Sequence, residues 1–383
     1  MSTLSLAIDS AAFVELVNER IQQLVMSGND PVHEVVSHLF NAGGKRIRPT
    51  LVLASASFKP FDQKVLIDVA SAIELVHMAS LIHDDIIDES STRRGSDTIN
   101  YKWNNLTAVL AGDYLFASAF NLLTTTKNHQ VLESLTNSIR LMCEGEINQS
   151  AQTFNCQQSE ADYFNNIYKK TACLFCTSCQ AGALTAGLPW EQIRLIEKFG
   201  LYLGYAYQIL DDILDLVATP CELGKPVGND LLHGILTLPV LRLLQDEQYG
   251  PELKQMLANR QITSEEVIKI VDCLYRRSDG LKYALNRFNQ MLNNAQAVLQ
   301  DLPAVPARTA IQEMSAQLFA KPLELAQHGL EPLEIRIANL FDHLSDLQSQ
   351  DKQLDLFPAA DWLPKLLNHS PGQTSIGLQE NYA

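Results

Sequence analysis

The stretch of sequence that decides the fold occurs twice, as Asp84-Asp85-Ile86-Ile87-Asp88 and as Asp211-Asp212-Ile213-Leu214-Asp215. Both runs have the pattern Asp-Asp-x-x-Asp, and both lie inside apolar sequence. In a helix, the first and last Asp of such a run lie on one face, one turn apart. Carboxylates at that separation repel each other unless a cation lies between them. Two such runs therefore predict a shared cavity that holds Mg²⁺ and a phosphorylated substrate.

Two simpler interpretations of these runs explain less. A single run of this kind is usually a solvated helix face or an acidic helix terminus. Two runs flanked by Ile, Leu and Val do not fit that pattern, because ionised Asp is rarely buried without a partner or a metal. The pair His83-Asp84 is also compatible with a metal-dependent phosphohydrolase. That alternative leaves Asp85, Asp88 and the second run without a role.

Composition narrows the function classes. The chain has 383 residues, 46% of them hydrophobic and only 19% charged, which suits a helical protein that buries much of its helix surface. The length allows one large domain or two ordinary ones. The formal net charge of −15 argues against a nucleic acid partner. An anionic substrate would need metal ions and a few well-placed Lys and Arg side chains.

Composition also bears on location and on the cysteines. We find no continuous apolar run of about 18 residues and no signal peptide, so we expect a soluble, cytoplasmic protein. Seven cysteines, an odd number, argue against a disulfide framework. Cys173, Cys176 and Cys179 have the spacing of a metal motif but no convincing fourth ligand nearby, and we expect them to be small core residues.

Helical periodicity dominates the chain, and alternating strand patterns are scarce. This periodicity predicts an all-α bundle of about ten or more helices, separated by turn-rich breaks such as Gly43-Gly44. The helices with the clearest patterns are Phe13–Met26, Leu66–Asp88, Ala108–Thr124, Gln130–Ala151, Ala161–Ala186, Gln192–Asp215, Leu236–Gln245, Ser264–Asp272 and Gly280–Gln300.

The C-terminal part of the chain differs from the rest. We expect a helical domain over residues 1–320 and a C-terminal extension of unknown role over residues 321–383, because Pro, Gly and Gln punctuate the latter. Glu331–Asp351 has an apolar face and predicts a helix. Leu354–Leu367, which carries Trp362, could dock on the bundle, on a partner or on a membrane surface. The favoured interpretation is a loosely packed appendage.

The Asp runs belong to a series of five motifs. In chain order these are Gly43-Gly44-Lys45-Arg46-Ile47-Arg48-Pro49, the first run with Arg93-Arg94-Gly95, Tyr168-Lys169-Lys170-Thr171-Ala172, Gly204-Tyr205-Ala206-Tyr207-Gln208 with the second run, and Gly224-Lys225-Pro226-Val227-Gly228-Asn229-Asp230. The series resembles the trans-type polyprenyl diphosphate synthases over about residues 10–320, in particular the long-chain heptaprenyl, octaprenyl and solanesyl diphosphate synthases. This resemblance implies the isoprenoid synthase fold, a helical bundle around a central cavity.

The resemblance implies a Mg²⁺-dependent condensation of isopentenyl diphosphate with an allylic diphosphate. The allylic substrate ionises to a delocalised carbocation, the double bond of isopentenyl diphosphate attacks it, and loss of a proton restores an allylic diphosphate. Metal ions act as Lewis acids on the leaving group. The released diphosphate can take the proton, so no side-chain base is expected, and the sequence contains no nucleophile-base pair that suggests covalent catalysis.

The resemblance also assigns roles to residues. The Mg²⁺ ligands would be Asp84 and Asp88 for two ions, and Asp211 with Asp215 for a third. Isopentenyl diphosphate would be held by Lys45, Arg48, His77 and Arg94. The allylic diphosphate would be clamped by Arg93, Lys170 and Lys225. The developing cation would be steadied by Thr171 and Gln208. Asp85 and Asp212 would orient the neighbouring residues or bind metal-bound water.

Two positions bear on the product and on the strength of substrate binding. Ala79 and Ser80 lie about one turn before Asp84, where short-chain members of the family carry bulky residues. Small side chains there predict an open tunnel and a long all-trans chain for a quinone; alternatively, they only allow close helix packing. Ile235 stands where family members often have Lys, so the allylic diphosphate loses one cation, and we expect Lys170 and Lys225 to suffice.

Other interpretations stay open beside the leading one. They are a shorter-chain geranylgeranyl or farnesyl diphosphate synthase, and a low-activity regulatory subunit of a heteromeric synthase. A terpene cyclase or head-to-head condensing enzyme fits less well, because Lys45, Arg48 and Arg94 provide for a second diphosphate. The resemblance implies a homodimer formed through apolar helix faces, with a heteromer as the alternative. A membrane-seeking product would place the enzyme at the membrane periphery.

Overall fold

The computed structural model describes residues 9–25, 31–218 and 228–329. Lys225 and the predicted segments Glu331–Asp351 and Leu354–Leu367 lie outside the described residues. The described part belongs to one compact unit that extends to Leu330.

The described residues are helical apart from one short antiparallel pair of strands, so the predicted all-α class is confirmed. The first half contains α1 (Ser10–Val25), α2 (Pro31–Asn41), α3 (Ile47–Ala56), α4 (Gln63–Ile87), β1 (Thr92–Arg93), β2 (Ser96–Asp97), α5 (Ile99–Lys102), α6 (Asn105–Thr126) and α7 (His129–Gln152). The second half contains α8 (Glu160–Ile167), the π-helix η1 (Tyr168–Ala172), α9 (Cys173–Thr185), α10 (Trp190–Val217), α12 (Asn229–Leu232), α13 (Leu238–Leu244), α14 (Gly250–Leu257), α15 (Ser264–Arg276), α16 (Gly280–Gln300) and α17 (Pro306–Gly329).

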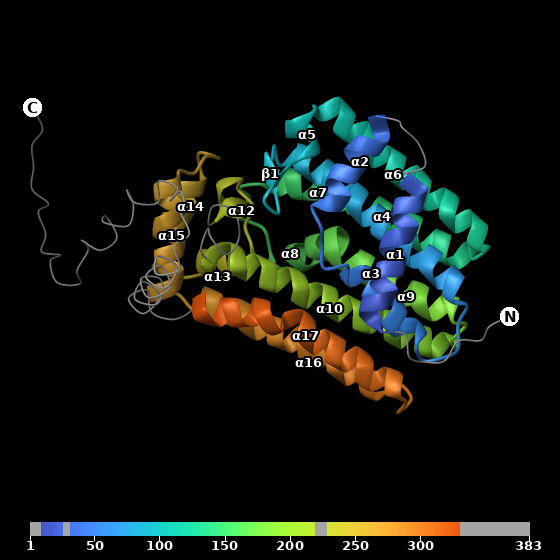
Figure 1. Cartoon of the computed structure of the whole chain (residues 1–383). Helices are drawn as coiled ribbons and strands as arrows, with labels where there is room; N and C mark the ends of the chain where they lie inside the picture. The colour runs from blue at the N-terminus through green and yellow to red at the C-terminus, as the bar shows by residue number, and fades with distance from the viewer. Residues whose placement is uncertain (1–8, 26–30, 219–227, 330–383) are drawn as a thin grey trace, which may run out of the picture. The chain divides into compact units, whose positions relative to one another are not determined.

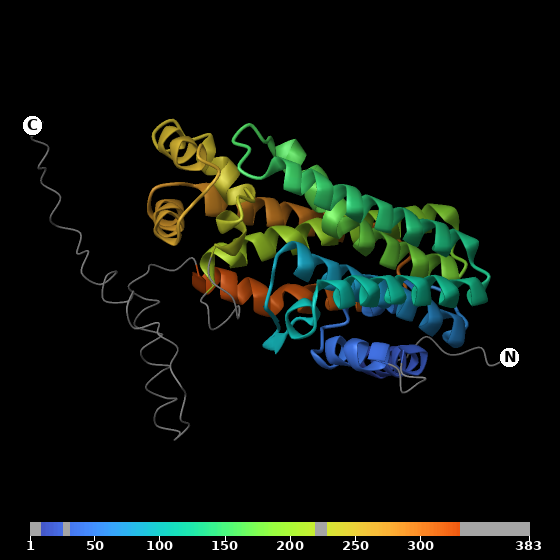
Figure 2. The same cartoon turned by 90° about the horizontal axis from the view of Figure 1, so that it is seen from above.

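The long helices run lengthwise through the bundle (Figures 1 and 2). α4 packs most extensively against α6, and α10 packs against α9 and α16. In Figure 1, α16 and α17 lie beneath α10, while α14 and α15 stand at one end of the bundle. The two helices that carry the Asp runs, α4 and α10, are therefore both interior helices whose apolar faces form the core.

Local sequence sets the ends of α4. The Asp62 side chain caps its N-terminus by accepting hydrogen bonds from the backbone N–H groups of Lys64 (2.9 Å) and Val65 (3.2 Å). At the other end, Asp88 is the C-cap residue, and its N–H donates to the carbonyl of Asp84 at 2.8 Å. The first Asp run thus forms the last turn of the helix.

The predicted continuous helix Ala161–Ala186 is wrong in its middle. The π-helix η1 interrupts it at Tyr168–Ala172, between α8 and α9. Gly145 of α7 makes room for this segment, because a Cβ at that position would lie 2.9 Å from the Cβ of Lys169. Single π-turns are often found at functional sites, and this one carries Lys170 and Thr171.

Three further predictions have clear outcomes. Cys173 and Cys179 are buried and Cys176 is partly buried, which confirms the core role of these cysteines. The helices α3, α5, α12, α14 and α17 were not predicted. The predicted boundary after residue 320 falls inside α17, which continues through Pro322 to Gly329.

Among the described residues, two helices are long and apolar enough to cross a membrane by length and composition alone. The apolar window of α4 is 78% buried, as expected of a core helix, but that of α6 is only 39% buried. The exposed face of α6 carries the apolar side chains of Leu106, Val109, Leu110 and Tyr114. An exposed apolar stripe of this kind is typical of a surface that contacts a partner.

Candidate active site

The first Asp run ends a helix with its charges in an unfavourable place. Asp84 is half-buried and Asp88 is exposed. Within α4, which is described in full, the last turn contains no basic residue. A helix C-terminus already carries partial negative charge, so carboxylates there are stabilised by a cation that is supplied from elsewhere.

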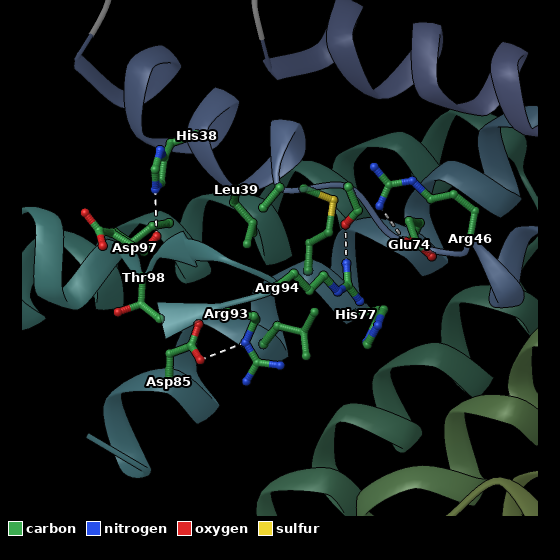
Figure 3. Close-up of a pocket in the computed structure, with 15 residues that line it drawn as sticks. His38, Leu39, Arg46, Glu74, His77, Asp85, Arg93, Arg94, Asp97 and Thr98 are labelled. Carbon is green, nitrogen blue, oxygen red and sulfur yellow. Dashed lines mark hydrogen bonds and ion pairs between the residues drawn. The ribbon is translucent and has the colours of Figure 1, made fainter. Parts of the chain in front are cut away.

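The middle carboxylate of the first run serves a different purpose. Asp85 is only 3% exposed, and its Oδ1 accepts a hydrogen bond from Nε of Arg93 at 2.7 Å. Arg93 lies on β1, and the short β1–β2 pair brings it back over the end of α4 (Figure 3). Asp85 therefore holds Arg93 beside the run, which fits an orienting role.

The second run lies in the last two turns of α10. Its Asp212 ends a series of hydrogen-bonded side chains. Asp211 is exposed, whereas Asp212 is 4% exposed. Asp212 accepts from the Tyr163 hydroxyl at 2.6 Å and from Nε2 of Gln208 at 2.8 Å. Gln208 Oε1 in turn accepts from the Thr171 hydroxyl at 2.6 Å. The two residues predicted to steady a cation, Thr171 and Gln208, are thus in direct contact.

Burial dominates the ionisation of this second run. Burial and the nearby Asp230 carboxylate raise the pKa of Asp212 well above its ordinary value, although the hydrogen bonds from Tyr163 and Gln208 favour the ionised form. Asp215 is also buried, and its Oδ2 accepts the backbone N–H of Asp230 at 3.2 Å. Asp215 therefore fastens the start of α12 to α10, and its predicted role as a Mg²⁺ ligand stays a prediction.

Lys170 joins the π-helix to the first Asp run. Its Nζ lies 2.7 Å from Oε1 of Glu146 on α7. Burial alone would lower the pKa of Lys170, but the carboxylates of Glu146 and Asp84 outweigh burial and raise it. The neighbouring pair, Lys169 and Glu144, is 3.1 Å apart. The two acids that flank Gly145 on α7 thus pair with two consecutive lysines of η1, Glu144 with Lys169 and Glu146 with Lys170.

The ionisation of Asp84 depends on its burial and on nearby charges. Burial raises the pKa of Asp84 to about 7, and Glu146 and Asp88 add to the shift despite the attraction of Lys170. The ionised form of Asp84 is therefore disfavoured mainly by its burial, and the two neighbouring carboxylates add to this effect. A divalent cation would favour the ionised form.

Of the basic residues predicted for the second diphosphate, His77 and Arg94 lie at the same pocket. His77, Arg93 and Arg94 line one pocket with Arg46 and Glu74 (Figure 3). Arg94 Nη1 donates to the carbonyl of Gly43. Burial and the charges of Arg48 and Arg94 hold the pKa of His77 well below its usual value, so His77 is neutral near pH 7.

Lys45 and Arg48 flank this pocket without lining it. Lys45 is exposed on the loop between α2 and α3. Arg48 is half-buried, with its guanidinium 5.2 Å from the centre of the Phe175 ring. Burial lowers the pKa of Arg48, while the Glu74 carboxylate acts against that shift. The structure therefore brings His77, Arg48 and Arg94 close enough to influence one another's charge.

The donor set fits Mg²⁺. Among the described residues, no group of three or more His, Cys, Asp or Glu side chains is arranged to hold a metal by itself. Mg²⁺ is usually held by one or two carboxylates together with substrate phosphates, so a complete protein cage is not required. Asp84, with its raised pKa, and Asp88 one turn on provide such a partial site.

The remaining predicted positions are near these groups. Ala79 has no exposed surface, and Ser80 is half-buried with its hydroxyl donating to the carbonyl of His77 at 2.9 Å. Ile235 is half-buried after Gly234, against whose Cα the Phe154 ring packs. Chain-length control by Ala79 and Ser80 stays a prediction.

Sequence reasoning did not find three residues that contact this site. Glu146, Glu74 and Tyr163 pair with Lys170, Arg46 and Asp212, respectively. Of these, only Glu146 could have been found from the sequence. It is one of two acids that flank Gly145, and two consecutive lysines follow in a later helical segment, a pattern that suggests ion pairs.

Comparisons with known proteins agree with this geometry. Residues 29–274 match the family model described as polyprenyl synthetase. The chain is 38% identical over 299 residues to heptaprenyl diphosphate synthase component 2 of Geobacillus stearothermophilus, covering 78% of this chain and 92% of that protein.

Solved structures give the same result. Heptaprenyl diphosphate synthase from Staphylococcus aureus superposes with a TM-score of 0.77 at 33% identity, covering 82% of this chain and 98% of that one. A polyprenyl synthase from Caulobacter crescentus, complexed with calcium and isoprenyl diphosphate, superposes with a TM-score of 0.75 at 31% identity, covering 82% and 97%. The motifs, the fold and these comparisons lead to one conclusion: the chain belongs to the polyprenyl synthetase family.

Proposed function

We propose that this chain is a Mg²⁺-dependent trans-prenyltransferase that condenses isopentenyl diphosphate with an allylic diphosphate into a long all-trans polyprenyl diphosphate. The observation that carries the proposal is the presence of two separate cationic groups. Lys170 interacts with the Asp84 carboxylate, while Arg94 and His77 line a pocket whose edge toward the first run is formed by Arg93 and Asp85. Two cationic groups suit two diphosphates, one that leaves and one that stays.

The residues divide the work accordingly. When bound at Asp84, Asp88 and Asp211, Mg²⁺ supplies Lewis-acid stabilisation of the leaving diphosphate. Lys170 and Arg93 hold that diphosphate by charge, and Asp85 keeps Arg93 in place through its 2.7 Å hydrogen bond. The proposal includes three Mg²⁺ ions per site, two at the first run and one at the second.

The second substrate is held apart from the first. Arg94, Arg48 and Lys45 grip the diphosphate of isopentenyl diphosphate, which keeps its diphosphate throughout the reaction. The Thr171–Gln208 pair presents oxygen atoms to the developing allylic cation. The new carbon–carbon bond uses the double-bond electrons of isopentenyl diphosphate, and the proton that is lost leaves with the released diphosphate.

A long product is supported by Ala79 and Ser80 and by the relatives. Both side chains are small, and the protein from Geobacillus stearothermophilus is named a heptaprenyl diphosphate synthase. Such a product would serve as a quinone side chain and would partition into membranes. We therefore place the enzyme in the cytoplasm, at the membrane periphery.

The exposed apolar face of α6 supports an assembly with a second protein. Leu106 is 70% exposed and Leu110 is 59% exposed, which is unfavourable for a monomer in water. A homodimer is the simplest arrangement, since two-fold interfaces pair the same surface on both chains. A heteromer has specific support, because the relative from Geobacillus stearothermophilus is named component 2 of its synthase.

One assay tests the function. The purified chain is incubated with Mg²⁺, labelled isopentenyl diphosphate and farnesyl diphosphate, and products are separated by length after phosphatase treatment. We expect long prenyl alcohols, and no product with EDTA. Products that stop at geranylgeranyl length would overturn the long-chain assignment. Product that forms only after a second subunit is added would establish the heteromer.

A further inference from the structure

The loop between α2 and α3 has an unusual backbone. It carries Lys45 and leads directly to Arg48, the two basic residues that flank the second pocket. Gly43 and Arg46 both adopt left-handed conformations, with φ of 74° and 48°. Glycine tolerates this region, but an arginine stays there only when its surroundings enforce it.

The side chain of Arg46 supplies that enforcement. Its Nη1 donates to Glu74 Oε1 on α4 at 3.0 Å (Figure 3). Its Nε donates to Asn18 Oδ1 on α1 at 2.9 Å. The guanidinium also lies 5.0 Å from the centre of the Phe40 ring. Arg46 is 8% exposed and Glu74 3% exposed, so this anchor is inside the protein.

The loop is also in contact with a predicted substrate ligand. Arg94 Nη1 donates to the carbonyl of Gly43. A Cβ at Gly44 would lie 2.6 Å from Arg94 Nη1 and 3.3 Å from Arg46 Nη1, so the glycine allows both guanidiniums to approach the backbone. Arg46 and Arg94 therefore hold the loop from two sides, and only Arg94 is exposed to solvent.

Stability alone does not explain a buried ion pair at this place. Burying two charges usually costs as much as their attraction returns, and such pairs serve best where they specify one geometry. Glu74 Oε2 has no hydrogen-bond partner among the described residues, although it lines the pocket with His77 and Arg94. Glu74 therefore has one oxygen bonded to Arg46 and one oxygen without a partner in the described part of the chain. A carboxylate in this state can hold the neighbouring cations in place until an anionic substrate binds.

We propose that Glu74 is a positioning residue, which acts through Arg46 to hold the Gly43–Arg48 loop in the geometry that binds the diphosphate of isopentenyl diphosphate. The proposal rests on the proposed function and adds to it a residue pair that does not touch the substrate. It separates Arg46, which shapes the loop, from Lys45 and Arg48, which contact the ligand.

The test is Glu74→Gln, which keeps the shape and one acceptor but removes the charge. We expect the KM for isopentenyl diphosphate to rise about tenfold, while the KM for the allylic substrate and kcat stay within about twofold. Glu74→Asp should recover part of the affinity. The matched control is Asp68→Asn, which breaks the 2.6 Å pair with Arg20 between the same helices, α1 and α4, away from the loop. It should leave both KM values unchanged.

Asn18→Ala guards against a variant that fails to fold. It removes the second anchor of Arg46 without leaving a buried charge unpaired, and should raise the KM for isopentenyl diphosphate about threefold. In the Arg46→Gln background, which has no cation to pair with Glu74, Glu74→Gln should have little further effect, because the two residues act as one unit.

Two outcomes overturn the proposal: an unchanged KM for isopentenyl diphosphate in both Glu74→Gln and Asn18→Ala, or an equal rise in the KM of both substrates. Failure of the proposed function is recognised separately, because the wild-type chain would then form no condensation product. Calorimetric titration with isopentenyl diphosphate alone would still test the positioning role. Glu74→Gln must then bind it more weakly than wild type does, and Asp68→Asn must bind it equally well.

Discussion

The two Asp runs share one sequence pattern but occupy different environments. In the first, Asp84 is half-buried and Asp88 is an exposed helix cap. In the second, only Asp211 is exposed, because Asp212 and Asp215 are both buried. In each run the middle Asp accepts hydrogen bonds from protein side chains. A repeated pattern therefore does not mean a repeated environment, and we expect the first run to offer two carboxylates to metal and the second to offer one.

The largest expected effect is at the first run. Asp84→Asn should lower kcat about a thousandfold, since a metal that polarises the leaving group contributes several kcal/mol to the transition state, about 4 kcal/mol here. Steady-state kinetics with labelled isopentenyl diphosphate measure this. Asp301→Asn, at the exposed C-cap of α16, is the control and should retain full activity. A loss below about tenfold in Asp84→Asn would remove the first run from the metal site.

The second run should respond unevenly. Asp211→Asn is expected to lower kcat about a hundredfold, and Asp215→Asn about tenfold or less. The second change should instead lower the melting temperature, because Asp215 accepts the N–H of Asp230 at 3.2 Å inside the protein. Kinetics and thermal unfolding of the same two preparations separate these effects. Equal losses of kcat with unchanged melting temperatures would show that both carboxylates bind metal.

The Glu146–Lys170 pair lies beside the first run. Glu146→Gln should lower kcat/KM for the allylic substrate about tenfold, because a charged hydrogen bond contributes about 1.5–3 kcal/mol. Glu144→Gln is the matched control, because Glu144 pairs at 3.1 Å with Lys169, the residue before Lys170. It should change kcat/KM for the allylic substrate less than about twofold. Equal effects of the two variants would mean that Glu146 provides only general surface charge.

The helices that bear the two runs were predicted well, and the reason is their composition. Predicted Leu66–Asp88 corresponds to Gln63–Ile87, and predicted Gln192–Asp215 to Trp190–Val217, because apolar residues recur at helical spacing in both. The helix α3 was missed because Gly43-Gly44 and Pro49 suggest a break, although proline is tolerated in a first turn. Side-chain pairs such as Arg46–Glu74 join separate helices, and local pattern contains no information about them.

The π-helix shows the same limit at the site itself. The residues Lys170 and Thr171 were assigned by resemblance, and the structure brings Lys170 to Asp84 and Thr171 to Gln208. Their backbone conformation depends on the close approach of α7 at Gly145, which is a tertiary contact. Sequence therefore pointed to candidate residues, while packing determines how their side chains are placed.

The residues that precede each run differ in size, and this difference bears on product length. Ser80 stands four residues before Asp84, whereas Tyr207 stands four residues before Asp211 and packs against Phe175 with ring centres 5.3 Å apart. From this difference in side-chain size we expect a growing chain to extend past the first run rather than past the second. Ala79→Phe and Ser80→Phe should shorten the product with turnover kept within about threefold. Chromatography of the prenyl alcohols measures this, and an unchanged length in both variants would leave close helix packing as the role of Ala79 and Ser80.

The smallest effect is expected after the second run, at Ile235. This side chain is half-buried, and its backbone N–H donates to the Asp230 carbonyl at 2.9 Å, so the segment is held by contacts that do not depend on a lysine. Ile235→Lys adds a cation to the segment that follows the second run, at the position where family members often have Lys. We expect kcat/KM for the allylic substrate to change less than about threefold, measured at fixed Mg²⁺. A rise of several orders of magnitude would mean that the second run is incomplete in the isolated chain, and that a partner subunit supplies the missing charge.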